Sequence, residues 1–351
     1  MTVNYYIPNT PSSKKSPIAS IIHTKTAILS MQQLTKTCHY QIYGITLSSN
    51  QPLPILIAAS KTSTTTVDVE VNITECELLD QDIKAENKHY RSGWYTKQKV
   101  DGIYYCLSLR GGNEILDVEI APDGKKIWIT WANLPLAEVT AILIGCILGT
   151  ALRLQGKICL HSSVIKVDNC AIAIIGAKGA GKSTTAAAFA KRGYPILADD
   201  IAVLADYGDS FLVQPGYPRL RLWKSAVNAV YGSEAELSRV FRQTDKHFVE
   251  LHQNNTSAWC FHSQPLPLAA IYILGERQQS LVTPSVETVT PQVGLMHLIT
   301  HRYPQSLKLQ QDMQRREFAV LGRLAAAVPM RHLHREDNLA ELGKVCEACV
   351  R

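Results

Sequence analysis

The chain has 351 residues, of which 46% are hydrophobic and 19% charged, so an intrinsically disordered protein is excluded and two domains are possible. The net charge of +6 is spread along the chain without a run of five like charges. This favours a solvated surface with a phosphate site over a nucleic-acid groove. The nine cysteines are scattered and no secretory signal is visible, so we expect a reducing cytoplasm. Cys346-x-x-Cys349 lacks a second pair, which favours packing over a zinc or redox site.

The first part of the chain divides into a leader and a β-rich segment. Residues 1–35 are rich in Ser, Thr, Pro and Lys, and we expect a flexible leader there. Residues 36–135 contain short alternating runs separated by turn signals, which predicts a mostly antiparallel β domain. The strand candidates are 39–47, 67–73, 93–95, 102–109, 115–120 and 126–131. This domain carries no recognisable catalytic constellation; it could cover the core, form a dimer contact or dock a substrate.

An apolar stretch at 136–155 separates this domain from the rest. Its uncharged centre is shorter than the roughly 20 apolar residues that a membrane span needs. We therefore expect a buried core helix and no membrane partner. A strand at 159–167 follows and leads into the most informative part of the chain.

A phosphate-binding loop is indicated at residues 171–204. Residues 171–175 predict a buried strand, and the next eight residues match G-x4-G-K-[ST] in full. A helix is expected from Thr184 to Arg192, ending at Gly193, and a second strand at 195–198 ends in Asp199-Asp200. In such a loop, backbone N–H groups and the helix start bind phosphates, while the lysine reaches the outer ones. The residues expected to hold ATP are Gly176, Ala177, Lys178, Gly179, Ala180, Gly181, Lys182, Ser183 and Thr184.

Carboxylates are needed for the magnesium ion that accompanies ATP. Ser183 supplies a hydroxyl ligand, and the second strand of a parallel sheet would bring the acidic pair beside the loop. His161 stands one strand earlier, where a proton carrier beside a phosphoryl site is useful, although a structural histidine is the alternative. Arg219 and Arg221 share one face of a predicted strand and could bind an anionic acceptor or pair with surface acids.

The remaining pattern continues the α/β alternation. A strand is expected at 266–274, helices around 292–302 and 316–327, and a short closing strand at 330–334. The predicted fold class is therefore α/β, with a P-loop domain at 136–351 behind the β-rich domain.

The loop, the helix ending in Lys-Arg-Gly and the strand ending in Ala-Asp-Asp resemble the core of HPr kinase/phosphorylase, a fold shared with phosphoenolpyruvate carboxykinase. His161, in Leu-His-Ser-Ser-Val, also matches that core. Residues 215–223 and 43–54 look like HPr-kinase-related proteins of peptide-tailoring clusters, such as lasso-peptide serine kinases. The resemblance spans roughly residues 40 to 340 and is strongest over 158–223.

The resemblance implies roles for three residues. Asp199 would be the general base, Asp200 would serve the metal together with Ser183, and His161 would assist at the phosphates. The chain departs from the usual pattern at Ala177-Lys178 and in the 219–223 run. These departures point to an acceptor other than HPr and put the reverse phosphorylase reaction in doubt.

We therefore expect an ATP- and magnesium-dependent kinase in which Asp199, His161 and Lys182 are catalytic. Its acceptor would be a serine hydroxyl of a peptide or small protein. A nucleotide-binding regulatory module without turnover and a kinase of a small hydroxylated metabolite are the alternatives. The sequence leaves the oligomeric state open.

Overall fold

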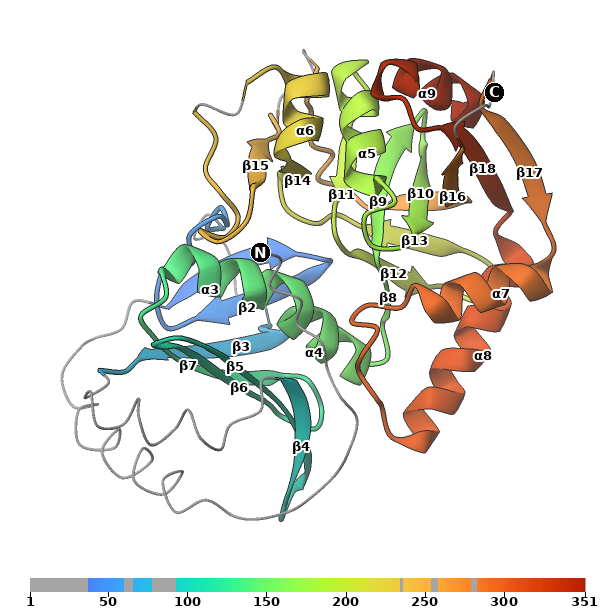
Figure 1. Cartoon of the computed structure of the whole chain (residues 1–351). Coiled ribbons are helices and arrows are strands. Elements are labelled where there is room, and N and C mark those ends of the chain that lie inside the picture. Colours follow the sequence, from blue (N-terminus) through green and yellow to red (C-terminus); the bar gives the residue numbers. More distant parts are fainter. Residues whose placement is uncertain are drawn as a thin grey trace.

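The computed structural model describes residues 37–59, 66–77, 93–233, 236–253, 258–278 and 283–350. The expected leader at 1–35 lies outside the described residues. Two sheets dominate the molecule, one built from the N-terminal third and one from the rest, and they are joined by a long broken helix (Figure 1). The mixed α/β fold is therefore confirmed.

The β-rich region forms a seven-stranded sheet in the order β1-β2-β3-β7-β6-β5-β4. Its strands are β1 (Cys38–Ile42), β2 (Ile45–Ser49), β3 (Val69–Glu75), β4 (Gly93–Lys99), β5 (Gly102–Gly111), β6 (Glu114–Ile120) and β7 (Lys126–Ala132). Four neighbouring pairs are antiparallel, as expected, but β3 runs parallel to both β2 and β7. A parallel pair needs a connection of a dozen or more residues, and residues 50–68 and 76–125 provide one on each side of β3.

The strand expected at 39–47 is two strands joined by a tight turn. Tyr43 and Gly44 both have positive φ, 56° and 72°, as a two-residue type I′ hairpin requires. The backbone N–H of Tyr43 donates to the carbonyl of Pro215 at 2.8 Å, and its hydroxyl donates to the carbonyl of Ile144 at 3.1 Å. The hairpin thereby ties the first sheet to the second half of the chain.

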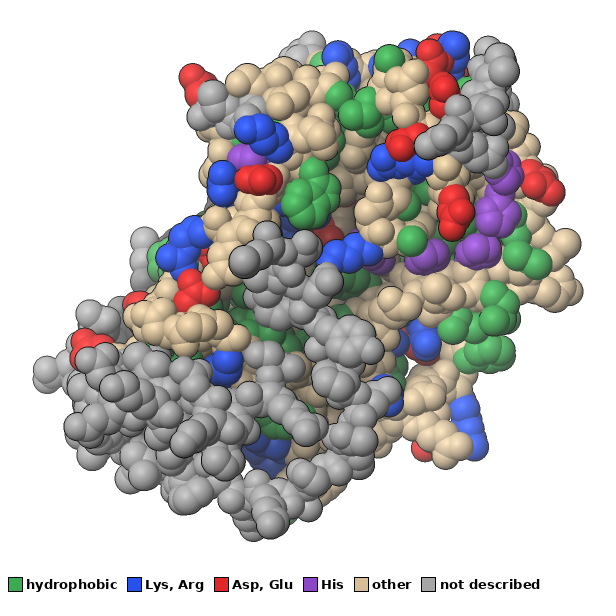
Figure 2. Space-filling model, in the orientation of Figure 1, with side chains coloured by type: hydrophobic (Ala, Val, Ile, Leu, Met, Phe, Trp, Pro, Cys, Tyr) green, Lys and Arg blue, Asp and Glu red, His purple; other side chains and the backbone are tan. Residues whose placement is uncertain are grey.

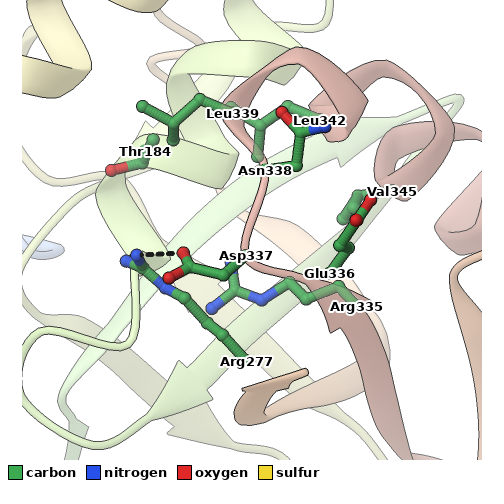
Figure 3. A pocket seen from close by; sticks show the side chains of 10 residues that line it. Thr184, Arg277, Arg335, Glu336, Asp337, Asn338, Leu339, Leu342 and Val345 are labelled. Carbon is green, nitrogen blue, oxygen red and sulfur yellow. Dashed lines mark hydrogen bonds and ion pairs between the residues drawn. The ribbon is translucent and has the colours of Figure 1, made fainter. Parts of the chain in front are cut away.

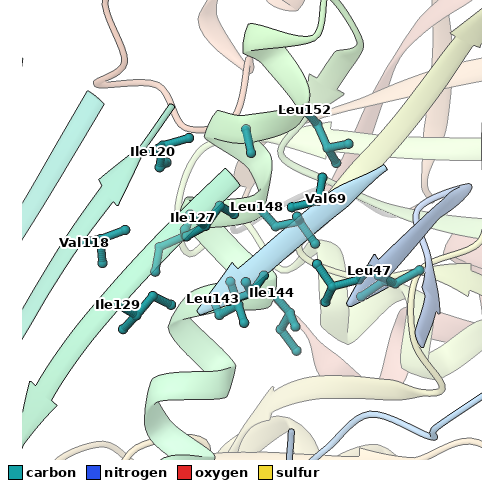
Figure 4. Close-up of a cluster of buried hydrophobic side chains, with 14 of the residues drawn as sticks. Leu47, Val69, Val118, Ile120, Ile127, Ile129, Leu143, Ile144, Leu148 and Leu152 are labelled. Atoms are coloured by element: carbon teal, nitrogen blue, oxygen red, sulfur yellow. The ribbon is translucent and has the colours of Figure 1, made fainter. Parts of the chain in front are cut away.

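The apolar stretch forms α3 (Leu136–Ile142), a π-helical segment η1 (Leu143–Ile147) and α4 (Leu148–Leu154). Leu143, Ile144 and Leu148 are fully buried and face side chains of the first sheet such as Val69 (Figure 4). Burying each such side chain contributes roughly 1.5–3 kcal/mol to the stability of the folded protein. Together, α3, η1 and α4 (Leu136–Leu154) form the one helix of the described residues that is long and apolar enough to span a membrane. Of its apolar window, 78% is buried inside the protein. The predicted core helix is thus present, and it shares its core with the sheet that precedes it.

The second sheet has nine strands. They are β8 (Ile158–Leu160), β9 (Ser162–Val167), β10 (Cys170–Gly176), β11 (Ile196–Ala198), β12 (Ala202–Asp206), β13 (Phe211–Gln214), β16 (Leu266–Gln278), β17 (Ser285–Val289) and β18 (Met330–Glu336). The main path is β11-β9-β10-β16-β13-β12-β8, with β18 beside β16 and β17 beside β18. A separate antiparallel pair, β14 (Arg219–Trp223) and β15 (Lys246–Glu250), lies beside it.

The strand expected at 159–167 is interrupted at His161. β8 pairs with β12, whereas β9 pairs with β10 and β11, so the chain changes neighbours at the histidine. The backbone N–H of His161 donates to the carbonyl of His301 at 2.8 Å instead of joining either ladder.

The parallel sheet that was expected to bring the acidic pair beside the loop is a mixed sheet at this point. β9 lies between β10 and β11 and is antiparallel to both. Because two strands antiparallel to a common neighbour run in the same direction, the ends of β10 and β11 still reach the same edge. The phosphate loop and the acidic pair are therefore brought together by a mixed sheet.

Helices cover the second sheet and follow its strands. They are α5 (Lys182–Lys191), α6 (Lys224–Ala226), the π-helical η2 (Val227–Tyr231), α7 (Pro291–Thr300), α8 (Gln311–Ala327), the 3₁₀ turn η3 (Leu339–Glu341) and α9 (Leu342–Val350). The expected closing strand is an interior one, since β18 has β16 on one side and β17 on the other. It is followed by α9, which buries Cys346 and Cys349 as core residues. Burial raises the pKa of both thiols to about 12, as expected of packing cysteines.

Candidate phosphate-binding site

The loop between β10 and α5 has the backbone of an anion site. Gly179 and Gly181 have φ of 82° and 98°, a region that side chains disfavour. Gly181 precedes the first turn of α5, and no side chain caps that turn. The first N–H groups of a helix have no partner within the helix, so this end is available to an anion. Ala177, Lys178 and Gly179 are exposed.

Lys182 is folded onto the loop. Its Nζ donates to the carbonyls of Gly176 at 2.9 Å and Ala177 at 3.1 Å, and the residue is buried. Burial lowers the pKa of Lys182 to about 8, although Asp199 and Asp200 act in the opposite direction. A buried ammonium held only by carbonyl groups would gain from a phosphate, so the loop fits the nucleotide that its sequence implies.

Asp199 is a buried carboxylate whose two oxygens are both used. Oδ1 accepts from the hydroxyl of Ser163 at 2.6 Å, and Oδ2 accepts from the backbone N–H of Arg221 at 2.9 Å. The residue is 1% exposed. Its role as the general base stays a prediction, and its contacts are those of a group that holds β9, β11 and β14 together.

Asp200 lies in a bend that follows the end of β11, not on an extended segment. It has φ of 74°, and its Oδ2 accepts from Nη1 of Arg221 at 3.1 Å. Its Oδ1 lies 3.8 Å from Nε2 of His161. Burial opposes its charge, but Arg221, Lys246, His161 and Lys182 outweigh burial and lower the pKa of Asp200. Asp200 is thus ionised at neutral pH.

His161 is brought to the acidic pair as expected. Its ring lies beside Tyr303, with centroids 5.4 Å apart. Burial first, and then Lys182, lowers its pKa to about 4, against the smaller effect of Asp200. The imidazole is therefore neutral at physiological pH and can accept or relay a proton.

The two arginines are not equivalent, although they share a strand face. Arg221 is buried and donates to Tyr217 OH at 2.7 Å, to the carbonyl of Ala141 at 3.0 Å and to Asp200. Arg219 is partly exposed and pairs with Glu250 at 2.9 Å. Of the two, Arg219 is the one that an acceptor could reach, and its proposed part in substrate binding remains a prediction.

Several site residues were not found from the sequence. Ser163 and Tyr217 hold Asp199 and Arg221, and the core helix approaches them because a Cβ on Gly145 would lie within 4 Å of both Arg221 and Asp200. The sequence could have indicated both, because Ser163 stands in the same motif as His161 and Tyr217 in the same run as Arg219. The contact with Gly145 had no signal, since it depends on how the two sheets pack.

A row of histidines also leads away from the site. The rings of His301, His297, His332 and His334 follow one another with centroids 6.2, 5.0 and 6.0 Å apart. Figure 2 shows histidine side chains gathered along this face, where α7 and β17 lie in Figure 1. Within the described residues, no group of three or more His, Cys, Asp or Glu could hold a metal ion.

A magnesium ion would therefore depend on oxygens other than a carboxylate cage. Mg²⁺ commonly binds through one or two protein oxygens, substrate phosphates and water, which is compatible with this site. Ser183, in the first turn of α5, and Asp200 are the residues expected to contribute.

No protein-family model and no curated protein sequence matches the chain. Among solved structures, the chain is similar to the Hpr(Ser) kinase/phosphatase from Coxiella burnetii, at 10% sequence identity and a TM-score of 0.28. The similarity covers 55% of this chain and 92% of the other. With a TM-score this low, the functional argument rests on the site itself.

Proposed function

We propose that the protein is a kinase that transfers the γ-phosphoryl group of ATP to a serine hydroxyl of a peptide or small protein. The observation that carries the proposal is the meeting of a P-loop lysine, a neutral histidine and an ionised aspartate at one edge of the sheet. Phosphoryl transfer needs mainly positioning and charge neutralisation, and this edge offers both.

In this proposal the loop and Lys182 hold the phosphates while Asp200 receives the acceptor. The acceptor oxygen forms a bond to the γ-phosphorus, the bond from that phosphorus to ADP breaks, and the hydroxyl proton passes to Asp200. Magnesium, when bound, neutralises charge on the phosphates. Asp199 is a positioning residue because both of its oxygens are already engaged. The proposal thus moves the base from Asp199 to Asp200, which the sequence analysis had assigned to the metal, and leaves Ser183 as the expected protein ligand of magnesium.

The geometry also suggests how the first sheet takes part. The carbonyl of Ala141 accepts from Arg221, which pairs with Asp200. The core helix of the first sheet therefore supports the reactive edge of the second. We propose a cytoplasmic protein.

The test is transfer of labelled γ-phosphate from ATP and magnesium to serine peptides, with ADP release measured in parallel. Wild type should release ADP only when an acceptor is present, and Lys182→Ala should lose turnover while keeping its circular dichroism spectrum. ATP binding without turnover on any peptide or small protein would favour a regulatory nucleotide-binding module. Unchanged turnover in Lys182→Ala would overturn the assignment of the loop.

A further inference from the structure

Two arginines donate to carbonyls of the phosphate loop, Arg277 to that of Gly179 and Arg335 to that of Ala180. A small pocket there is lined by Gly181, Thr184, Arg277 and Arg335, and also by the acidic Glu336 and Asp337 (Figure 3). Arg335 is in β18 and Arg277 in β16, and the two strands are parallel neighbours. A Cβ on Gly181 would lie 3.3 Å from Nη1 of Arg335 and 3.5 Å from Nη2 of Arg277. Both guanidinium groups therefore approach the glycine that opens α5.

Among the described residues, only one of the two arginines forms an ion pair with a carboxylate. Arg277 forms an ion pair with Asp337 at 2.7 Å. Arg335 donates to the carbonyl of Ala180, and no carboxylate among the described residues forms an ion pair with it. It is 4% exposed, and its Nε has no hydrogen-bond partner among the described residues. A buried charge left in this state is costly, and a bound anion would remove the cost.

The position of the pair indicates which anion it would meet. Lys182 is influenced electrostatically by Asp199 and Asp200, whereas Arg335 is influenced by Arg277 and Asp337. The loop thus has two separate cationic ends. The lysine of a P-loop reaches the outer phosphates, and the backbone at the helix start holds the inner ones. Arg335 and Arg277 lie at the helix start, beside Thr184.

We infer that Arg335 and Arg277 bind the phosphate nearest the ribose, the α-phosphate of a nucleoside di- or triphosphate. This inference rests on the proposed function, because it assigns a second subsite of the same nucleotide. The α-phosphate would then contribute to the affinity for the donor nucleotide. On binding, Arg335 would donate to phosphate oxygens in place of the carbonyl of Ala180. Arginine suits this role because its planar donors match phosphate oxygens in pairs.

The test is ³¹P NMR and calorimetric titration of ADP with the full chain. Wild type should shift both the α- and β-phosphorus resonances. Arg335→Met should weaken ADP binding at least tenfold, and at saturation the α-resonance should return toward its free position while the β-resonance stays shifted. Arg335→Lys should restore part of the affinity. Arg192→Met, an arginine at the other end of α5 that pairs with Glu347, is the matched control and should bind ADP as wild type does.

The outcomes separate this inference from the proposed function. Unchanged ADP affinity in Arg335→Met, or equal loss of both resonance shifts at saturation, overturns the inference and leaves the kinase assignment intact. A wild-type chain that binds no ADP overturns both. If Arg335→Met does not fold, Arg277→Met gives the same measurement, since its side chain is 39% exposed and its loss should leave the fold intact.

Discussion

Nη1 of Arg221 lies 3.1 Å from Oδ2 of Asp200, and the backbone N–H of the same arginine donates to Oδ2 of Asp199. One residue of β14 therefore fixes both members of the acidic pair. Its Nε is held by Tyr217, four residues earlier in the same motif. The run at 215–223, which the sequence suggested for acceptor binding, thus also holds the two carboxylates of the acidic pair in place.

Arg221→Met should destabilise the protein strongly. The substitution leaves the carboxylate of Asp200 buried without its cation, and breaking a buried pair costs about 3–5 kcal/mol. Urea unfolding followed by circular dichroism measures the loss. Arg219→Met, on the same strand, is the control and should cost under about 1 kcal/mol because its partner Glu250 is exposed. Equal losses in the two variants would contradict the special role of the buried arginine.

The two aspartates should differ in how their loss responds to magnesium. Asp200→Asn removes the proposed proton acceptor, so turnover should fall at least a hundredfold at every magnesium concentration, in line with the usual contribution of a general base. Asp199→Asn should mainly lower stability, because Ser163 and the N–H of Arg221 lose a charged partner. Turnover of both variants is measured across a magnesium titration. Recovery of Asp200→Asn at high magnesium would instead make Asp200 a metal ligand and return the base to Asp199.

Nucleotide affinity should fall in mildly alkaline solution. The pKa of Lys182 is lowered from 10.5 to about 8 in the unliganded protein, so its positive charge is lost as the pH rises through 8. ATP binding should therefore become coupled to proton uptake and weaken between pH 8 and 9.5. Calorimetry in buffers of different ionisation enthalpy measures the uptake. Lys182→Arg keeps its charge at these pH values, so its ATP affinity should not fall over this range. If its affinity declines with pH as that of wild type does, the deprotonation of Lys182 is not the cause.

Two histidines should make the protein less stable in acid. The pKa values of His161 and His301 are lowered from 6.5 to about 4, mainly by burial and by Lys182. As the pH falls from 6.5 toward 4, the unfolded chain takes up these protons while the folded chain does not, so the free energy of unfolding decreases. Each site should contribute on the order of 1 kcal/mol.

Urea unfolding at pH 7, 6, 5 and 4.5 tests this dependence. His161→Gln and His301→Gln should each flatten the decline, and His39→Gln, an exposed position on β1, should leave it unchanged. A decline as steep in both buried-site variants as in wild type would show that other groups cause it.

The sequence was a good guide wherever a local pattern fixes the geometry. The loop at 176–183 and α5 were predictable because glycines, a lysine and a helix start have a fixed relation in space. The interruption at His161 was not, because β8 and β9 separate only by pairing with β12 and β10, which are far away in the chain. Hydrophobic periodicity does not record such long-range pairing.

The same limit explains the site residues that were missed. Arg221 and Arg219 alternate along one strand and look alike in sequence, yet the first is buried under the core helix and the second meets solvent. What distinguishes them is the approach of Ala141 and Gly145 from the first sheet. No pattern within residues 215–223 encodes that approach.

The acceptor side gives the last prediction, and it concerns Arg219. Its guanidinium lies over the ring of Phe248, with 5.4 Å from Cζ to the ring centroid, and its partner Glu250 is largely exposed. A peptide carboxylate could therefore replace Glu250 at little cost. Since Arg221 is occupied by Asp200, Tyr217 and a backbone carbonyl, we expect any carboxylate preference to depend on Arg219 alone.

A serine peptide supplied as the free acid and as the C-terminal amide measures this preference. Amidation should lower kcat/KM of wild type about five- to tenfold, as expected for the loss of one charge-assisted hydrogen bond of about 1–1.5 kcal/mol. Arg219→Ala should phosphorylate both forms at the lower rate, and Glu250→Gln should favour the free acid more strongly because the competing carboxylate is gone. If kcat/KM of wild type is the same for the two peptides, the acceptor is recognised without its terminal carboxylate. Arg219 is then a surface residue of β14 with no part in acceptor binding.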